Sequence, residues 1–351
     1  NYLLGGFHDS AYGTIVDQGY DEIMDIFAEV GDVVKEVYLA DDTSDEVCLF
    51  NPTSTKFNGV YESSDGRIAL VGEIAPYSSK KVKYDPERLN QAPKERAVLT
   101  EAIFTGKEER VVRESDGEII VIENEYFTIE ADNKGIRKIV DKRYGTVCDT
   151  LDGNRPCEWI LESDNGSAWA RLEAPYKTTP LSENTTFLQF EKGEKYRKLC
   201  FKTNFTRHGV NSVALRPIMY WSVTLFDGYD RVRLNANVHW EAANVRLMTC
   251  FPIPIENGKD IYGIPGGRLE RQPYTPDYSW NGADGDYPAY KYAGVESDNL
   301  SVAVFNRGTP AYKILPAEGG RKMYVTVLRS PTMPVYLHEP HSYTMTEYDG
   351  M

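Results

Sequence analysis

From Glu118 onward, short runs of β-branched and aromatic residues follow one another, with turn signals between them. Residues 119–122 and 126–129 are two such runs, and Asp132-Asn133-Lys134-Gly135 then predicts a tight turn before a third at 136–140. Further strands are predicted at 186–190, 197–206, 219–226, 230–240, 245–252, 301–305 and 322–328. Many strands without a helix between them predict a large antiparallel β sandwich.

One long helix is predicted, over residues 15–39. Its apolar residues recur at alternating steps of four and three, which is typical of one continuous helical face. They are Val16, Tyr20, Ile23, Phe27, Val30, Val34 and Val37. Such a narrow face needs partner helices, so we expect the helix to be the last of a bundle whose other members precede Asn1. Because the sequence opens on Asn rather than Met, we also expect it to be a piece of a longer protein.

A small β module is predicted between the helix and the sandwich. Residues 47–50 form an apolar run that Asn51-Pro52 ends, and residues 68–71 and 81–84 form two more. The next stretch is charged and predicts a connection. The predicted domains are therefore the end of a helical bundle at 1–42, the β module at 43–85, the connection at 86–116 and the sandwich at 117–351. We expect the sandwich to be incomplete at its C-terminal end.

Charge and hydropathy exclude several classes of partner. The chain has 39 Lys and Arg against 53 Asp and Glu, a net charge of −14, and a phosphate-backbone binder needs a basic surface instead. No apolar run is long enough for a membrane helix. We therefore expect no nucleic-acid partner and no membrane partner. A hydrophobic fraction of 41% is ordinary for a globular protein and too high for a disordered one.

The number and spacing of the cysteines indicate in which cellular compartment the protein is found. There are five, widely spaced and without a CxxC pair, so a zinc ribbon and a thioredoxin motif are excluded. We interpret them as buried free thiols in a reducing compartment, which favours a bacterial cytoplasm. A lysosomal or secreted protein is the alternative, and four glycosylation sequons would matter only there. The sequons begin at Asn165, Asn184, Asn204 and Asn299.

The 24 tyrosines suit either strand rims or a carbohydrate site, because an aromatic face covers the C–H face of a sugar. Residues 277–294 hold Trp280 and three tyrosines among Gly and Asp, which predicts a long exposed loop that reaches a substrate or is pinned by its own aromatics.

His338 and His341 lie three residues apart, but Pro340 prevents a helix from presenting both to a metal. We interpret them as parts of a terminal loop.

The segment most suggestive of chemistry is His8-Asp9, just before the predicted helix. An imidazole and a carboxylate at a helix mouth can bind a metal and a ligand. From chemistry alone, a turn and cap role is the simpler interpretation.

The motif His8-Asp9-x-x-x-Gly13-Thr14 followed by an amphipathic helix resembles the one that closes the catalytic region of family 38 glycoside hydrolases, the zinc-dependent α-mannosidases. Later segments resemble that family in the same order. They are residues 47–52, 123–127, 135–142, 262–271, 302–308 and 325–331. At one position the sequence departs from the family, since Gly266 stands where Phe is usual.

The resemblance implies a mainly β fold, in which the sandwich is a large antiparallel β supersandwich of the galactose mutarotase-like type. It also implies that His8 is the last zinc ligand and that Asp9 contacts the mannose in the −1 site. The family's other ligands, including a His-x-Asp pair, and its catalytic carboxylates come from an N-terminal α/β domain. No histidine in this sequence is followed two residues later by Asp. The pair is therefore absent, and no catalytic residue is assigned here.

We therefore expect a fragment of a retaining α-mannosidase that hydrolyses terminal α-mannosides of glycans or oligosaccharides. Its expected partners are that substrate and its own N-terminal catalytic domain. A retaining glycosidase needs two carboxylates, and zinc affinity depends on the number of ligands. We expect zinc in the parent enzyme, and neither bound zinc nor activity in the fragment alone. The alternative is a stand-alone β-sandwich carbohydrate-binding or interaction module.

Overall fold

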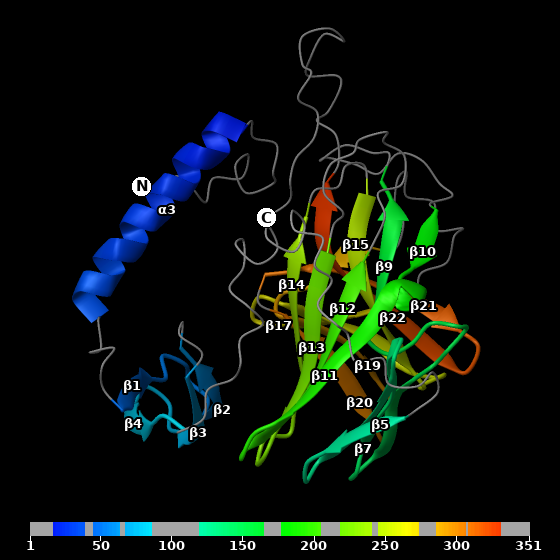
Figure 1. Ribbon diagram of the computed structural model, residues 1–351, viewed down its shortest axis with the longest axis horizontal. Coiled ribbons are helices and arrows are strands. Elements are labelled where there is room, and N and C mark those ends of the chain that lie inside the picture. Colours follow the sequence, from blue (N-terminus) through cyan, green and yellow to red (C-terminus); the bar gives the residue numbers. More distant parts are fainter. Residues whose placement is uncertain are drawn as a thin grey trace, which may run out of the picture. The chain divides into compact units, whose positions relative to one another are not determined.

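The structure is a computed structural model (Figure 1) that describes residues 17–38, 45–63, 67–85, 119–164, 177–204, 218–240, 245–273, 286–306 and 308–330. The chain forms two compact units, Asn1–Glu109 and Arg110–Met351. Mainly β structure, as predicted, makes up the described elements, together with one α-helix and one short 3₁₀ helix. Neither helix of this part of the chain is long and apolar enough to span a membrane.

The predicted long helix is present as α3 (Asp17–Tyr38) in the first unit. On its described side chains, Ile23, Phe27 and Val30 are half-buried, whereas Asp21 and Asp25 are exposed. This pattern confirms the amphipathic face. The described ranges contain no other α-helix, so the bundle stays a prediction.

The first unit also contains the strands of a small β module, in two antiparallel pairs. One pair joins β1 (Glu46–Phe50) and β4 (Ser79–Lys83), and the other joins β2 (Phe57–Glu62) and β3 (Ile68–Ile74). Asn51 is 3% exposed and ties the pairs together, because its side-chain amide donates to the carbonyl oxygens of Ile74 and Ala75. The whole of the predicted connection, residues 86–116, lies outside the described residues.

The second unit contains four antiparallel sheets, two of them simple meanders of four strands (Figure 1). The first comprises β5 (Ile120–Glu123), β6 (Phe127–Asp132), β7 (Gly135–Asp141) and β8 (Gly145–Asp149). The second comprises β11 (Thr185–Lys192), β12 (Tyr196–Asn204), β13 (Ile218–Phe226) and β14 (Arg233–His239). The 3₁₀ helix η1 (Ser182–Asn184) precedes β11.

The other two sheets bring distant segments together. The six-stranded sheet has the order β10 (Thr178–Pro180), β9 (Glu158–Ser163), β15 (Val245–Ile253), β22 (Gly320–Ser330), β21 (Ala311–Ala317) and β18 (Asp286–Pro288). The last sheet has the order β17 (Gly267–Arg271), β16 (Lys259–Ile264), β19 (Tyr292–Glu296) and β20 (Ser301–Phe305). Every strand predicted beyond residue 118 is present.

Among the described residues, two main hydrophobic cores hold these sheets together, and Ile160, Met248 and Cys250 form a small separate cluster on the six-stranded sheet. The larger core takes side chains from the β5–β8, β11–β14 and six-stranded sheets, and Trp221 joins them. Its ring stacks on Phe201 at 4.3 Å and meets Trp159 edge-on at 6.2 Å. The smaller of the two main cores lies between the six-stranded sheet and the sheet of β16, β17, β19 and β20, around the buried rings of Tyr262 and Tyr312. Burial of this apolar area is the main force that fixes the layers.

Two turns of the β5–β8 sheet, the first of them predicted from the sequence, form for identifiable reasons. Between β6 and β7, the Asp132 carboxylate accepts the backbone N–H of Lys134 at 2.8 Å, and Gly135 adopts a φ of 123°. Between β7 and β8, Asp141 likewise accepts the backbone N–H of Arg143 at 2.8 Å. Local side-chain acceptors and glycine are the usual means of closing such turns.

Candidate functional site

The residues predicted to carry chemistry, His8 and Asp9, lie outside the described residues, so their roles stay predictions. His338 and His341 lie outside them as well, and among the described residues His239 is the single histidine, half-buried on β14. Within the same ranges, no group of three or more His, Cys, Asp or Glu side chains is placed to hold a metal ion. This part of the chain therefore offers no fit for a zinc ion.

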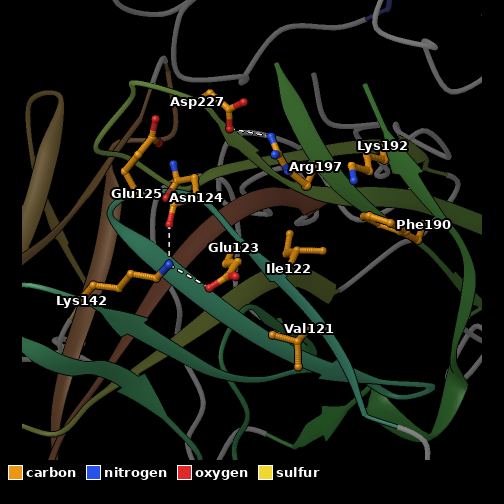
Figure 2. Close-up of a pocket in the computed structure, with 10 residues that line it drawn as sticks. All are labelled: Val121, Ile122, Glu123, Asn124, Glu125, Lys142, Phe190, Lys192, Arg197 and Asp227. Carbon is orange, nitrogen blue, oxygen red and sulfur yellow. Dashed lines mark hydrogen bonds and ion pairs between the residues drawn. The ribbon is translucent and has the colours of Figure 1, made fainter. Parts of the chain in front are cut away.

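The structure instead presents a surface hollow of about 530 Å³ in the second unit. It lies where the turn after β5 meets the hairpin tips that follow β11 and β13, as Figure 2 shows. Its lining residues come from segments more than a hundred residues apart. They are Val121, Ile122, Glu123, Asn124, Glu125, Lys142, Phe190, Lys192, Arg197 and Asp227.

Asn124 anchors one wall of the hollow. Its side-chain amide donates to the carbonyl oxygens of Phe226 at 2.8 Å and Tyr229 at 3.1 Å, and its side-chain oxygen accepts the backbone N–H of Tyr126 and Phe127. These bonds join the β5–β6 turn to the β13–β14 turn. Because the 7% exposed Asn124 uses both donors and accepts twice, it is a fully satisfied structural anchor rather than a binding group.

Two ion pairs line the hollow (Figure 2). Lys142 Nζ lies 2.8 Å from Glu123 Oε2 and also donates to the Asn124 carbonyl oxygen at 2.7 Å. The hydrogen bond and the positive charge of Lys142 lower the pKa of the Glu123 carboxyl. Arg197 NH1 lies 2.5 Å from Asp227 Oδ1 on the other side. The Glu123 carboxylate is therefore ionised near neutral pH, and both carboxylates are held in place by their basic partners.

Apolar side chains form the rest of the lining. Phe190 on β11 is 45% exposed and Val121 on β5 is 53% exposed, high values for large apolar residues on strands. Lys192 lies beside Phe190 (Figure 2), and its side chain has neither a hydrogen bond nor an ion pair to another described residue. The hollow thus combines an accessible aromatic ring with charged groups.

Away from the hollow, a buried ion cluster crosses the six-stranded sheet. It comprises Glu162 on β9, Arg246 on β15, Asp286 on β18 and Lys313 on β21. Arg246 is 2% exposed; its Nε lies 2.8 Å from Glu162 Oε1, and its NH1 contacts Asp286. Lys313 Nζ lies 3.7 Å from the same Asp286 carboxylate. The cluster has the contacts of a structural ion network, and its partners are too far apart in sequence for a motif to reveal it.

The prediction of a long exposed loop over residues 277–294 was wrong for its second half, residues 286–294. That stretch contains β18 and the start of β19, and the Tyr287 ring meets Tyr262 edge-on at 5.8 Å. The Arg271 guanidinium lies 4.2 Å from the Tyr287 ring centroid. These contacts hold the chain on the smaller core. Residues 277–285, with Trp280, lie outside the described residues.

All five cysteines are free thiols, as predicted. Cys148, Cys157 and Cys250 are buried, and burial raises the pKa of each thiol, that of Cys157 to about 12. Cys48 on β1 is exposed and departs from the expectation of burial. The three buried thiols are therefore protonated and unreactive at neutral pH.

Comparisons with known proteins give a consistent result. Residues 122–336 match the sequence family described as the glycosyl hydrolases family 38 C-terminal domain. The fold is similar to an α-mannosidase from Enterococcus faecalis V583, at a TM-score of 0.55 and 14% identity, over 85% of this chain and 36% of that one. It is also similar to a glycosyl hydrolase family 38 protein from Enterococcus faecalis, at a TM-score of 0.53 and 14% identity, over 83% of this chain and 36% of that one. None of the curated proteins compared with the chain matches it.

Proposed function

The chain belongs to glycosyl hydrolase family 38, and from this premise we propose that it is the middle and C-terminal part of a retaining α-mannosidase. The observation that carries the proposal is the match of residues 122–336 to the family's C-terminal domain. The chain spans only about 36% of the α-mannosidase with a similar fold, which supports a role as one part of a longer enzyme. Its substrates are terminal α-mannosides of glycans or oligosaccharides.

In this proposal the second unit is a scaffold. Its four antiparallel sheets around two cores support a β supersandwich of the galactose mutarotase-like type. The amphipathic face of α3 supports a place at the end of a helical bundle. A retaining glycosidase uses a nucleophile and an acid/base carboxylate about 5–5.5 Å apart. Both belong to the N-terminal catalytic domain, so the chain by itself hydrolyses nothing.

The chain's direct contribution to the active site is His8-Asp9. The His8 imidazole is one ligand of a zinc ion held mainly by the N-terminal domain, and Asp9 contacts the mannose. Bound zinc would hold sugar hydroxyls and favour distortion of the ring. The enzyme works in a bacterial cytoplasm, which the five free thiols support.

Activity and metal content of the longer gene product test the proposal. The longer protein should release nitrophenol from nitrophenyl α-mannoside but not from the β-anomer. His8→Ala should lower both the zinc content and the rate, whereas Asp9→Asn should lower the rate and leave the zinc in place. His239→Ala, a change on β14, is the control and should alter neither. A longer product that hydrolyses no α-mannoside would overturn the proposal and favour the stand-alone module.

A further inference from the structure

We propose that the hollow in Figure 2 is a binding site for a neutral saccharide, with Phe190 as its stacking surface. This goes beyond the proposed function, because it assigns a ligand to residues of β5, β11, β12 and the adjoining turns. Only the choice of mannosides as the first probes rests on the proposed function.

The dimensions and the apolar lining suit a sugar. A volume of about 530 Å³ falls within the usual range of small-molecule sites, roughly 300–1,000 Å³. The Phe190 ring is 45% exposed, and Val121 and the buried Ile122 line the same hollow. A pyranose presents a C–H face, which covers such a ring at little cost in solvation.

The charges of the lining favour a neutral ligand. Lys142, Lys192 and Arg197 face Glu123, Glu125 and Asp227, so the formal charges cancel. An anion would meet three carboxylates, and a cation would meet three positive groups. Sugar hydroxyls both donate and accept, and they can pair with either kind of group without a net charge of their own.

Hydrogen-bonding capacity remains available in the lining. Lys142 uses two of its three donors, on Glu123 and the Asn124 carbonyl oxygen. Lys192 uses none within the described residues, and a carboxylate such as that of Glu123 has about four lone-pair positions. The ion pairs and the Asn124 anchor hold these groups before a ligand arrives, which lowers the entropy cost of binding.

Equilibrium binding to the full 351-residue chain tests the inference. Methyl α-mannoside, an α-linked mannobiose, methyl α-glucoside, methyl α-galactoside and inorganic phosphate are each titrated, with calorimetry and ligand-observed NMR as readouts. Phe190→Ala should weaken binding by about tenfold. Phe305→Ala is the matched control, because Phe305 on β20 is 63% exposed and does not line the hollow; it should bind like the unaltered chain. Lys192→Ala is a second variant at an exposed position and should weaken binding several-fold.

Three results would overturn the inference. The first is that no mannoside, glucoside or galactoside binds the chain. The second is that Phe305→Ala weakens binding as much as Phe190→Ala. The third is that inorganic phosphate binds through Lys192 while saccharides do not. Each result is independent of hydrolysis by the longer gene product, so failure here leaves the proposed function to its own test.

Discussion

At the scale of single residues, two buried asparagines, one in each unit, each hold chain segments together through several hydrogen bonds to the backbone. Asn51 accepts the backbone N–H of Thr53 at 3.1 Å while its amide holds the end of β3, and Asn124 joins two turns of the second unit in a similar way. A buried amide that pairs with several backbone groups fixes a loop more rigidly than packing alone. Removing it leaves several buried groups without partners, and that loss dominates the cost.

Asn124→Ala should lower the free energy of unfolding by about 2–4 kcal/mol. The carbonyl oxygens of Phe226 and Tyr229 would lose their donor, and two backbone N–H groups would lose their acceptor. Urea unfolding followed by circular dichroism measures the change. Asn237→Ala, at an exposed position of β14, should change it by less than about 0.5 kcal/mol. Equal losses in the two variants would contradict the anchor role.

Arg246→Ala should cost about 3–5 kcal/mol, because Glu162 and Asp286 would lose the cation they share in a buried setting. The comparison is Lys259→Ala, which breaks an exposed pair with Glu270 and should cost less than about 1 kcal/mol. Thermal unfolding of both variants checks the contrast. A cost for Arg246→Ala as small as that of Lys259→Ala would show that the buried ion cluster contributes little.

At the scale of elements, the β16–β17 hairpin explains the glycine at position 266. Pro265 precedes Gly266, whose φ is 78°, and this combination is that of a type II turn. Apart from Gly266 and its two chain neighbours, no heavy atom lies within 4 Å of the position that a Cβ at Gly266 would take. Glycine is therefore needed for its positive φ and not to avoid a steric clash. The glycine at 266, where the resemblance implies Phe, therefore has a local conformational reason.

Gly266→Ala should destabilise the protein by about 1 kcal/mol, because an L side chain is strained at positive φ. The neighbouring Gly267 begins β17 with an ordinary φ, and a Cβ there would meet only an Ile264 atom at 4.0 Å. Gly267→Ala should therefore be neutral within about 0.5 kcal/mol. The two melting temperatures test this, and a larger loss for Gly267→Ala would contradict the turn assignment.

A buried ion pair links β16 to β22 and makes stability depend on pH. Burial raises the pKa of Asp260 to about 6, although Arg321 Nε lies 3.2 Å away and favours the carboxylate. A carboxyl whose pKa is raised on folding contributes stability that is complete below its unfolded pKa and is lost as the pH rises through its folded pKa. For Asp260 that loss falls between about pH 4 and pH 6.

Asp260→Asn should remove this contribution. The free energy of unfolding of the unaltered chain, measured relative to the variant, should fall as the pH rises from 4 to 6, and it should be constant above about pH 7. Urea unfolding at several pH values measures the difference. A difference that rises with pH over that window would show that Arg321 outweighs burial.

The types of the secondary-structure elements could be predicted from local sequence patterns, whereas the candidate site could not. The 3.6-residue period gave α3, and alternation with turn residues gave β6, β7 and β11–β15. The predicted strands do not include β2, β8, β9, β10, β16, β17, β18, β19 and β21. The short β18, for example, spans three residues, which are too few to show a period, and its place depends on pairing with β21. The hollow was missed because Asn124 and Phe226 are 102 residues apart, and only the fold brings them together.

At the scale of the whole molecule, the described part of the second unit consists of antiparallel sheets packed around hydrophobic cores. Its charged side chains are largely paired, its buried thiols are protonated, and no cluster of metal ligands occurs in the ranges described. The net charge of −14 agrees with a substrate that is neutral. The proposal that another domain supplies the nucleophile rests on the family match of residues 122–336 and not on these features.

In our proposal, this chain supplies a structural scaffold and one wall of the active site, whereas the catalytic carboxylates come from another domain. The most direct measurement is release of nitrophenol from nitrophenyl α-mannoside by the purified 351-residue chain, with zinc added and omitted. We expect a rate equal to the buffer blank in both cases, and no zinc retained after dialysis. Release that rises in proportion to the concentration of the chain would contradict it.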